Sequence, residues 1–144
     1  MKAKRVLAVT IGWAERIDLP EWGVKQLRAK TDTGARTSAL HVEKVKTLAR
    51  NRISFDVILH RKVRTRRVRV VTRISRRSRV RSSTGEYSYR YFVRTSMRVG
   101  TVEKEIEISL VDRGDMIFRM LLGRTALAGS FLVDPSRRNL SDAK

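Results

Sequence analysis

The sequence contains no cysteine, so disulfide bonds and thiolate-ligated metal sites are excluded, and a reducing compartment is the simplest location. Long hydrophobic runs are also missing. The apolar run nearest the start, residues 6–9, is too short for the core of an export signal and far too short to cross a membrane. We therefore expect a cytoplasmic protein without a membrane partner.

Acidic residues are scarce. The 144 residues include 14 Asp and Glu against 33 Lys and Arg, which gives a formal net charge of +19 at pH 7. A field of this strength attracts polyanions or acidic peptides, and it opposes the association of two copies at low salt. Hydrophobic residues make up 41% of the chain, enough for one core. The composition predicts a folded, basic protein whose charge serves either an anionic partner or solubility alone.

Short apolar–polar alternations separated by turn signals predict a mostly β protein. Residues 53–60 place Ile53, Phe55 and Val57 on one side of a half-buried strand. Further strands are expected at residues 5–11, 68–74, 87–95, 102–111, 117–122 and 131–133. Residues 24–30 form only a short amphipathic segment. We predict one domain over residues 1–134, a small closed or nearly closed β barrel with one short helix near residues 123–128, followed by a polar, frayed tail over residues 135–144.

Residues 61–81 form a strongly basic segment, and no acidic residue occurs between Asp56 and Glu86. Its basic members are Arg61, Lys62, Arg64, Arg66, Arg67, Arg69, Arg73, Arg76, Arg77, Arg79 and Arg81. Interleaved valines predict β structure with one face coated in guanidinium groups. That face is either a solvated edge that resists aggregation or a docking surface for an anion, nucleic acid included. RNA readers usually interleave exposed aromatics, but only 6% of this chain is aromatic and its tyrosines follow the segment.

The tripeptide Asp32-Thr33-Gly34 carries the chemistry that an aspartic peptidase needs. Such an enzyme places a carboxylate on a tight turn opposite a second carboxylate, and the two share one proton because both cannot ionise at close range. The Thr33 hydroxyl can lock the turn, and Gly34 lets the backbone come close to a partner. The same tripeptide also occurs in ordinary loops as an Asx turn. A hydrophobic run ending in Gly123-Arg124 adds a second motif.

These motifs resemble a bacterial branch of the retropepsin-like aspartic proteases. The members are often labelled "ATP-dependent zinc protease" and are found beside, or fused to, a ribosomal-protein glutamate ligase of the ATP-grasp kind. The resemblance extends over nearly the whole chain, in residues 11–13 with Glu15, 19–21, 29–41, 80–85, 94–95, 112–116 and 121–124. It implies a retropepsin-like fold, Asp32 at the active site, a peptide or protein substrate, and a link to the ligase or the ribosome.

A single Asp-Thr-Gly supplies one carboxylate, whereas the mechanism needs two. The resemblance therefore implies a homodimer in which Asp32 of each subunit meets across a twofold axis. Asp112, Asp115 and Asp134 are the alternative partners within one chain, although each looks more like a turn residue.

Position 36 departs from the viral members of the clan. They usually carry an acid four residues after the catalytic Asp, and the arginine of the late Gly-Arg pairs with it. Here that position is Arg36, which would repel Arg124. Either Arg124 binds another carboxylate or the dimer differs from the viral one. A bolder hypothesis is that Arg36 faces the substrate and selects acidic side chains through a bidentate pair.

The remaining residues expected to support the site or bind substrate are Ala35, Thr37, Gly123, Ser83 and Gly85. Retropepsins cover the dyad with a β-hairpin flap. The turns at residues 61–65 and 82–85 are the candidates for it, although both can be ordinary turns. Trp13 and Trp22 are interpreted as packing residues.

We expect neither zinc nor ATP, despite the label of the family. Zinc needs three or four Cys, His or carboxylate ligands, and the only histidines are His41 and His60. His41 is expected to make a hydrogen bond in a loop or sheet. No phosphate-binding Gly-rich motif is present. The leading hypothesis is an aspartic endopeptidase with an acidic preference. The alternatives are a non-catalytic peptide-binding or regulatory module of the same fold, and a basic RNA- or ribosome-associated protein.

Overall fold

The computed structural model describes residues 7–60, 62–63, 65–81 and 83–142. The strands are β1 (Val9–Gly12), β2 (Ala14–Leu19), β3 (Val24–Thr31), β4 (Ser38–Leu48), β5 (Arg52–Ile58), β6 (Arg67–Arg73), β7 (Arg76–Arg81), β8 (Tyr87–Val99), β9 (Val102–Val111), β10 (Met120–Leu122) and β11 (Phe131–Asp134). A 3-10 turn, η1 (Pro20–Trp22), and one short helix, α1 (Arg124–Leu127), complete the fold. None of the helices within these ranges is long and apolar enough to cross a membrane.

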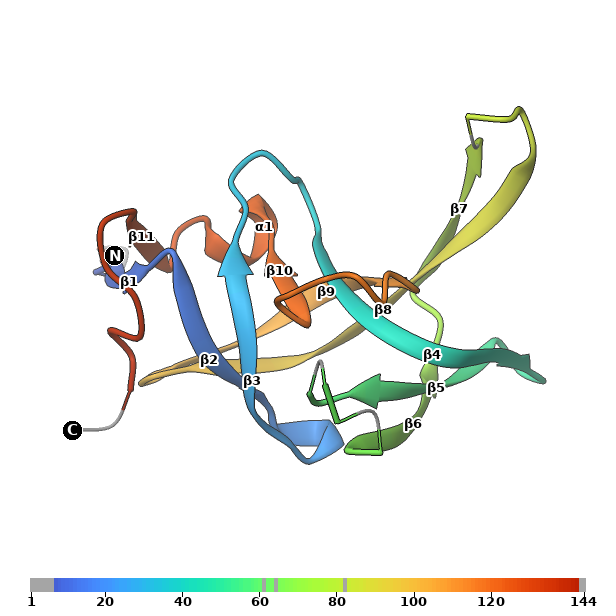
Figure 1. Ribbon diagram of the computed structural model, residues 1–144, viewed down its shortest axis with the longest axis horizontal. Coiled ribbons are helices and arrows are strands. Elements are labelled where there is room, and N and C mark those ends of the chain that lie inside the picture. Colours follow the sequence, from blue (N-terminus) through green and yellow to red (C-terminus); the bar gives the residue numbers. More distant parts are fainter. Residues whose placement is uncertain (1–6, 61, 64, 82, 143–144) are drawn as a thin grey trace, which may run out of the picture.

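The predicted barrel is confirmed, and it closes through the three-residue strand β10 (Figure 1). Following the hydrogen bonds, β10 pairs with β3, β3 with β2, β2 with β8, β8 with β9, and β9 with β4. The ring is complete because β10 also pairs with β4, Met120 lying opposite Leu40 and Leu121 opposite Ala39. The predicted helix is also confirmed, and it follows β10 directly.

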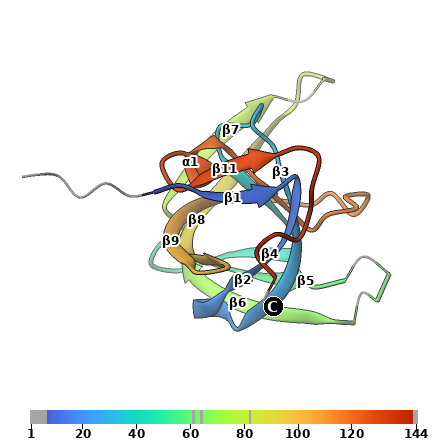
Figure 2. The same ribbon diagram turned by 90° about the vertical axis from the view of Figure 1, so that its left-hand side faces the viewer.

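Two additions extend this ring. Strands β5 and β6 continue the sheet beyond β4, and β7 pairs with the first half of β8 in a ribbon that projects away from the barrel (Figure 1). Strand β1 lies parallel to β11 in a separate pair across one end of the barrel (Figure 2). The first part of the strand expected at residues 5–11 lies outside the described residues.

The core follows the expected alternation except in β5, which is buried on both faces, Ser54 included. Ile53, Phe55 and Val57 are fully buried, as predicted. Asp56, predicted to face solvent, is buried as well. The reason is that Arg67 and Arg69 on the adjacent strand β6 both donate hydrogen bonds to its carboxylate. Burial raises the pKa of Asp56, but these two guanidinium groups outweigh burial and hold that pKa below its ordinary value. Two arginines of the basic segment, Arg67 and Arg69, are therefore paired with a carboxylate of the same chain.

The C-terminal segment, expected to be frayed, makes several hydrogen bonds to the barrel between Arg137 and Ser141. The backbone N–H groups of Leu140 and Ser141 and the Ser141 hydroxyl all donate to the carboxylate of Glu15. Glu15 is 1% exposed and also accepts the Gly12 N–H at 2.6 Å. A side chain at Gly12 would overlap the Arg137 carbonyl, since an added Cβ would lie 2.3 Å from that oxygen. The tail is fixed because a buried carboxylate needs these donors.

We expect Glu15→Gln to destabilise the protein in a pH-dependent manner. Burial raises the pKa of Glu15, but the hydrogen bonds from Ser141, Gly12 and Leu140 hold it below its ordinary value of 4.5. A lowered pKa means that the stabilisation is present above the unfolded value and is lost as the pH falls through the folded value. Urea denaturation should therefore show a deficit of about 1–3 kcal/mol near neutral pH. A deficit that stays constant into strong acid would contradict this assignment.

Candidate active site

Asp32 lies directly after β3 on a loop that its own carboxylate shapes. The Asp32 N–H donates to the Leu122 carbonyl at 2.8 Å, which ties the loop to β10. The carboxylate Oδ1 accepts the Gly34 N–H at 3.1 Å, and the Asp32 carbonyl accepts the Ala35 N–H at 3.2 Å. The result is an Asx turn that leaves the carboxylate partly exposed. Among the described residues nothing bonds the second oxygen, Oδ2, so it is available to a water or a partner.

Arg124 holds this loop from the other side. Its Nη1 donates to the carbonyl oxygens of Thr33 at 3.0 Å and Gly34 at 3.1 Å. Its backbone N–H donates to the Ala35 carbonyl at 2.8 Å, and the Thr125 N–H donates to the Arg36 carbonyl at 3.0 Å. Consecutive carbonyls of the loop are thus satisfied by one arginine and by the free N–H groups at the start of α1.

These contacts remove the conflict expected between Arg36 and Arg124. Arg124 does not need an acid at position 36, because backbone carbonyls accept its hydrogen bonds. Within the described chain Arg124 bonds to backbone carbonyls and to no carboxylate. The turn is also not locked through the Thr33 hydroxyl within the described residues; its carbonyl is used instead.

Gly123 is required by the close approach of two backbones. Its N–H donates to the Ser38 hydroxyl at 3.1 Å, a buried contact. A Cβ at position 123 would lie 2.6 Å from the Thr37 carbonyl carbon and 2.7 Å from the Thr37 oxygen. Gly123 thus joins the end of β10 to the start of β4. The sequence did not identify Ser38 as a site residue, because a serine inside a strand carries no signal of its own.

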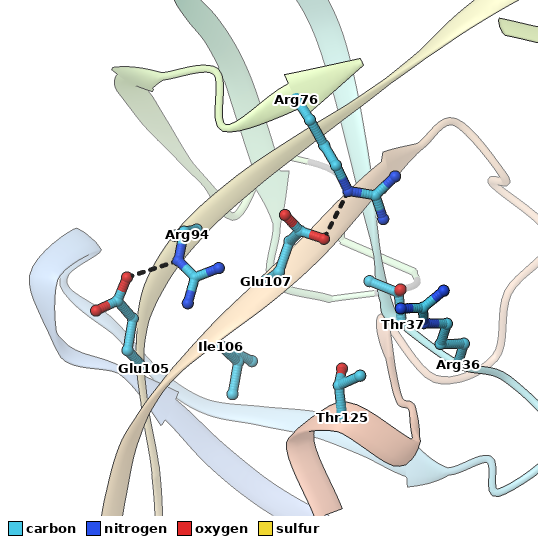
Figure 3. Close-up of a pocket in the computed structure, with 8 residues that line it drawn as sticks. All are labelled: Arg36, Thr37, Arg76, Arg94, Glu105, Ile106, Glu107 and Thr125. Carbon is cyan, nitrogen blue, oxygen red and sulfur yellow. Dashed lines mark hydrogen bonds and ion pairs between the residues drawn. The ribbon is translucent and has the colours of Figure 1, made fainter. Parts of the chain in front are cut away.

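Arg36 lies beside a cavity of about 390 Å³ (Figure 3). Thr37 and Thr125 line the same side as Arg36. The rest of the lining is Ile106 and the two ion pairs Arg94–Glu105, at 2.8 Å, and Arg76–Glu107, at 2.9 Å. Within the described chain the Arg36 guanidinium makes no hydrogen bond or ion pair, so its charge is available to a ligand in this cavity.

The structure brings none of the alternative intrachain carboxylates to Asp32. Asp134 Oδ1 accepts the N–H and the hydroxyl of Ser136, so it is a turn residue. Asp112 follows β9, whose last residue pairs with His41, three residues along β4 from Ser38. Three residues along a strand correspond to about 10 Å, so His41 is about that far from Ser38 along β4. Asp115 lies on the same loop as Asp112. In the part of the chain that the structure describes, no contact joins any of them to Asp32.

The two histidines make hydrogen bonds, which is the role favoured for His41. His41 is fully buried; its Nδ1 accepts the Arg113 N–H at 3.0 Å, so Nε2 carries the proton donated to Glu43 at 3.1 Å. His60 Nδ1 accepts the backbone N–H groups of Lys62 and Val63. No group of three or more His, Cys, Asp or Glu side chains within the described ranges could hold a metal ion.

No hydrogen bond within the described residues joins the predicted flap residues to Asp32. Ser83 and Gly85 occupy the turn between β7 and β8, at the tip of the projecting ribbon, and Gly85 has a φ of 88°. Of the second flap candidate, Arg61 and Arg64 lie outside the described residues. Trp13 packs edge-on against Phe118 at 5.8 Å.

A family model described as RimB-like, retropepsin-like aspartic endopeptidase RimB, matches residues 10–144. A Shewanella halifaxensis protein named "Probable alpha-L-glutamate ligase" is 35% identical over 131 residues, 88% of this chain and 28% of that protein. A Desulfotalea psychrophila protein of the same name is 33% identical over 129 residues, with the same coverage. The chain thus spans only 28% of the length of these relatives.

Among solved structures, a Legionella pneumophila protein of unknown function (DUF785) has a TM-score of 0.76 and 22% identity to this chain. The match covers 93% of this chain and 98% of the other. At that identity the likeness shows a shared fold. The family match, which extends over almost the whole barrel, shows more: the chain belongs to the RimB-like family of retropepsin-like aspartic endopeptidases.

Proposed function

We propose that this protein is an aspartic endopeptidase, active as a homodimer in which Asp32 of each subunit supplies one carboxylate of the catalytic dyad. The observation that carries the proposal is the Asx turn at Asp32. The turn is bound by β10 and Arg124, and it leaves Oδ2 without a partner among the described residues. A carboxylate that served only the turn would not need a loop clamped at consecutive carbonyls. Thr33 and Gly34 complete the catalytic loop.

The chemistry follows from one proton shared by two carboxyl groups. The ionised carboxylate removes a proton from a water molecule, whose oxygen bonds to the carbon of the scissile carbonyl. The protonated carboxyl gives its proton to the carbonyl oxygen, so a tetrahedral diol forms. When the C–N bond breaks, the leaving nitrogen takes the proton of the dyad, and one hydroxyl of the diol returns its proton to the dyad as it becomes the carbonyl of the acid product. One water is consumed, and the pair again holds a single proton.

Ala35, Arg36, Thr37, Gly123 and Arg124 are proposed to support this loop or bind substrate. Ser83 and Gly85, at the tip of the β7–β8 ribbon, are proposed as the flap. The relatives named as glutamate ligases suggest that the peptidase works in the cytoplasm with such a ligase, or on a ribosomal protein that the ligase modifies.

The substrate is proposed to be acidic, and Arg36 is the residue that selects it. Its guanidinium beside the cavity is not bound by any described acid, whereas Arg76 and Arg94 across the cavity are already paired. We expect Arg36→Ala to lower kcat/KM for peptides with an acidic side chain about tenfold relative to neutral peptides, because a charge-assisted hydrogen bond is lost. Arg50→Ala, which removes a charge on a distant turn, is the matched control. An unchanged acidic-to-neutral ratio in Arg36→Ala would rule out this role.

The endopeptidase proposal is tested by digesting a mixed peptide library at several pH values and resolving the products by mass. Cleavage by the wild-type protein, absent in folded Asp32→Asn, is the expected result. No cleavage by wild-type protein that is demonstrably folded and dimeric would overturn the proposal. It would favour the alternative, a non-catalytic peptide-binding or regulatory module of the same fold.

A further inference from the structure

The β7–β8 ribbon presents arginine and tyrosine on one face. We define the ribbon face as Arg77, Arg79 and Arg81 of β7 together with Tyr87, Tyr89 and Tyr91 of β8. In the antiparallel register Arg77 is opposite Tyr91, Arg79 opposite Tyr89, and Arg81 opposite Tyr87. Directly opposed residues point to the same side of a sheet, so these six side chains share one face.

The guanidinium groups stack on the tyrosine rings across the ribbon. Arg77 lies 4.8 Å from the centre of the Tyr89 ring, and Arg79 lies 4.4 Å from the centre of the Tyr87 ring. The rings nevertheless stay accessible, since Tyr87 is 56% and Tyr89 53% exposed. Each ring therefore combines guanidinium contacts, from Arg79 and Arg81 at Tyr87 and from Arg77 at Tyr89, with exposed surface.

The arginines of the ribbon face differ from other arginines of the basic segment in their partners. Arg67 and Arg69 bond to Asp56, and Arg76 bonds to Glu107. In the part of the chain that the structure describes, neither Arg77, Arg79 nor Arg81 forms an ion pair with a carboxylate; their contacts are the tyrosine rings. Unneutralised charge is therefore concentrated on a ribbon that projects from the barrel (Figure 1).

The geometry points to a binding surface for single-stranded nucleic acid on the ribbon face. Residues two apart along a strand are spaced by about 6.7 Å at the backbone, and the guanidinium groups that they carry offer paired donors to phosphates. The open tyrosine surfaces provide stacking sites for unpaired bases. An acidic peptide would use the arginines but has no flat ring to place on the tyrosines, and a duplex keeps its bases stacked within itself. A nucleic acid single strand uses both components.

None of the six residues of this surface belongs to the loop around Asp32, although they lie on the same ribbon as Ser83 and Gly85, the proposed flap. The low aromatic content argued against nucleic acid at the level of the sequence. The structure changes that assessment, because strand pairing places the tyrosines that follow the basic segment directly opposite its arginines.

The test is fluorescence anisotropy of a labelled twelve-nucleotide oligo(U), and of oligo(dT), titrated with the full chain between about 50 and 200 mM NaCl. We expect Arg77→Gln/Arg79→Gln/Arg81→Gln to weaken binding at least tenfold and to reduce the slope of log K against log salt by about 2, because each phosphate contact on a single strand contributes about 0.7. The control Lys25→Gln/Lys46→Gln/Arg50→Gln removes the same charge elsewhere. A loss in the control as large as in the ribbon variant would overturn the proposal.

The tyrosines separate nucleic acid from other polyanions. We expect Tyr87→Leu/Tyr89→Leu to weaken oligo(U) binding roughly fivefold or more with an unchanged salt slope, and Tyr87→Phe/Tyr89→Phe to keep it. A labelled peptide of twelve glutamates should bind both variants as it binds wild type. Equal oligo(U) binding by the Leu variant and wild type would show a surface for acidic peptides, and the proposal would fail. Asp32→Asn should bind oligo(U) normally, so the outcome does not depend on peptidase activity.

Discussion

Diluting the wild-type chain tenfold into the Asp32→Asn chain is expected to lower peptide cleavage about a hundredfold at constant total protein. After subunit exchange, only about one dimer in a hundred contains two Asp32 carboxylates, because both positions must be filled by chance. A chain that acted alone, with Asp32 and a second carboxylate of its own, would lose about tenfold. The measured quantity is the initial rate of cleavage of the best library peptide at moderate salt, where the repulsion between two +19 chains is screened.

The control for that experiment is dilution into Asp115→Asn. Asp115 is exposed and lies on the loop after β9. Every dimer then keeps two Asp32 residues, so the rate should stay close to that of undiluted wild type. A tenfold fall in the Asp32→Asn mixture would show that one chain carries a complete dyad, and the homodimer mechanism would have to be abandoned.

Gly123→Ala is expected to cost about 3 kcal/mol or more in the free energy of unfolding. Its Cβ would lie 2.6 Å from a backbone atom of Thr37, and a backbone cannot move aside as a flexible side chain can. The same displacement would break the bond from the Gly123 N–H to Ser38 and shift Arg124, which holds the Asp32 loop. Urea denaturation gives the stability, and any folded fraction should have lost peptide cleavage.

Gly129→Ala is the matched control. Gly129 has a φ of 78°, and an added Cβ would meet nothing within 4 Å. Only the left-handed backbone is penalised there, by about 1 kcal/mol. Equal losses at the two positions would mean that conformation, and not the overlap with Thr37, explains the effect at Gly123.

The candidate site was easier to propose from the sequence than the strands next to it. Asp32-Thr33-Gly34 and Gly123-Arg124 are short contiguous motifs and could be recognised directly. Strand β3, in contrast, was seen only as a short amphipathic segment. Its buried residues, Val24, Leu27 and Ala29, lack regular alternation because Gln26 has a φ of 57° and the register with β2 shifts. That irregular spacing imitates an amphipathic helix.

Other features could not be predicted because their partners are distant in the sequence or have no side-chain signature. No strand was assigned to β4, where Lys44 has a φ of 53° and the register with β5 shifts. Glu15 binds Leu140 and Ser141, which lie 125 and 126 residues away. Arg124 binds backbone carbonyls, which every residue type carries. The order of the tail and the role of Arg124 therefore depend on tertiary structure.

The late position of β10 has a consequence for the cell during translation. Met120–Leu122 closes the barrel, and the next residues hold the Asp32 loop, so the site exists only after the ribosome has released the chain beyond Arg124. A nascent chain that already displays Asp32 has neither closure nor clamp, and non-local strand pairing of this kind forms slowly. The Asp32 loop therefore acquires its final geometry only late in synthesis, after most of the barrel has left the ribosome.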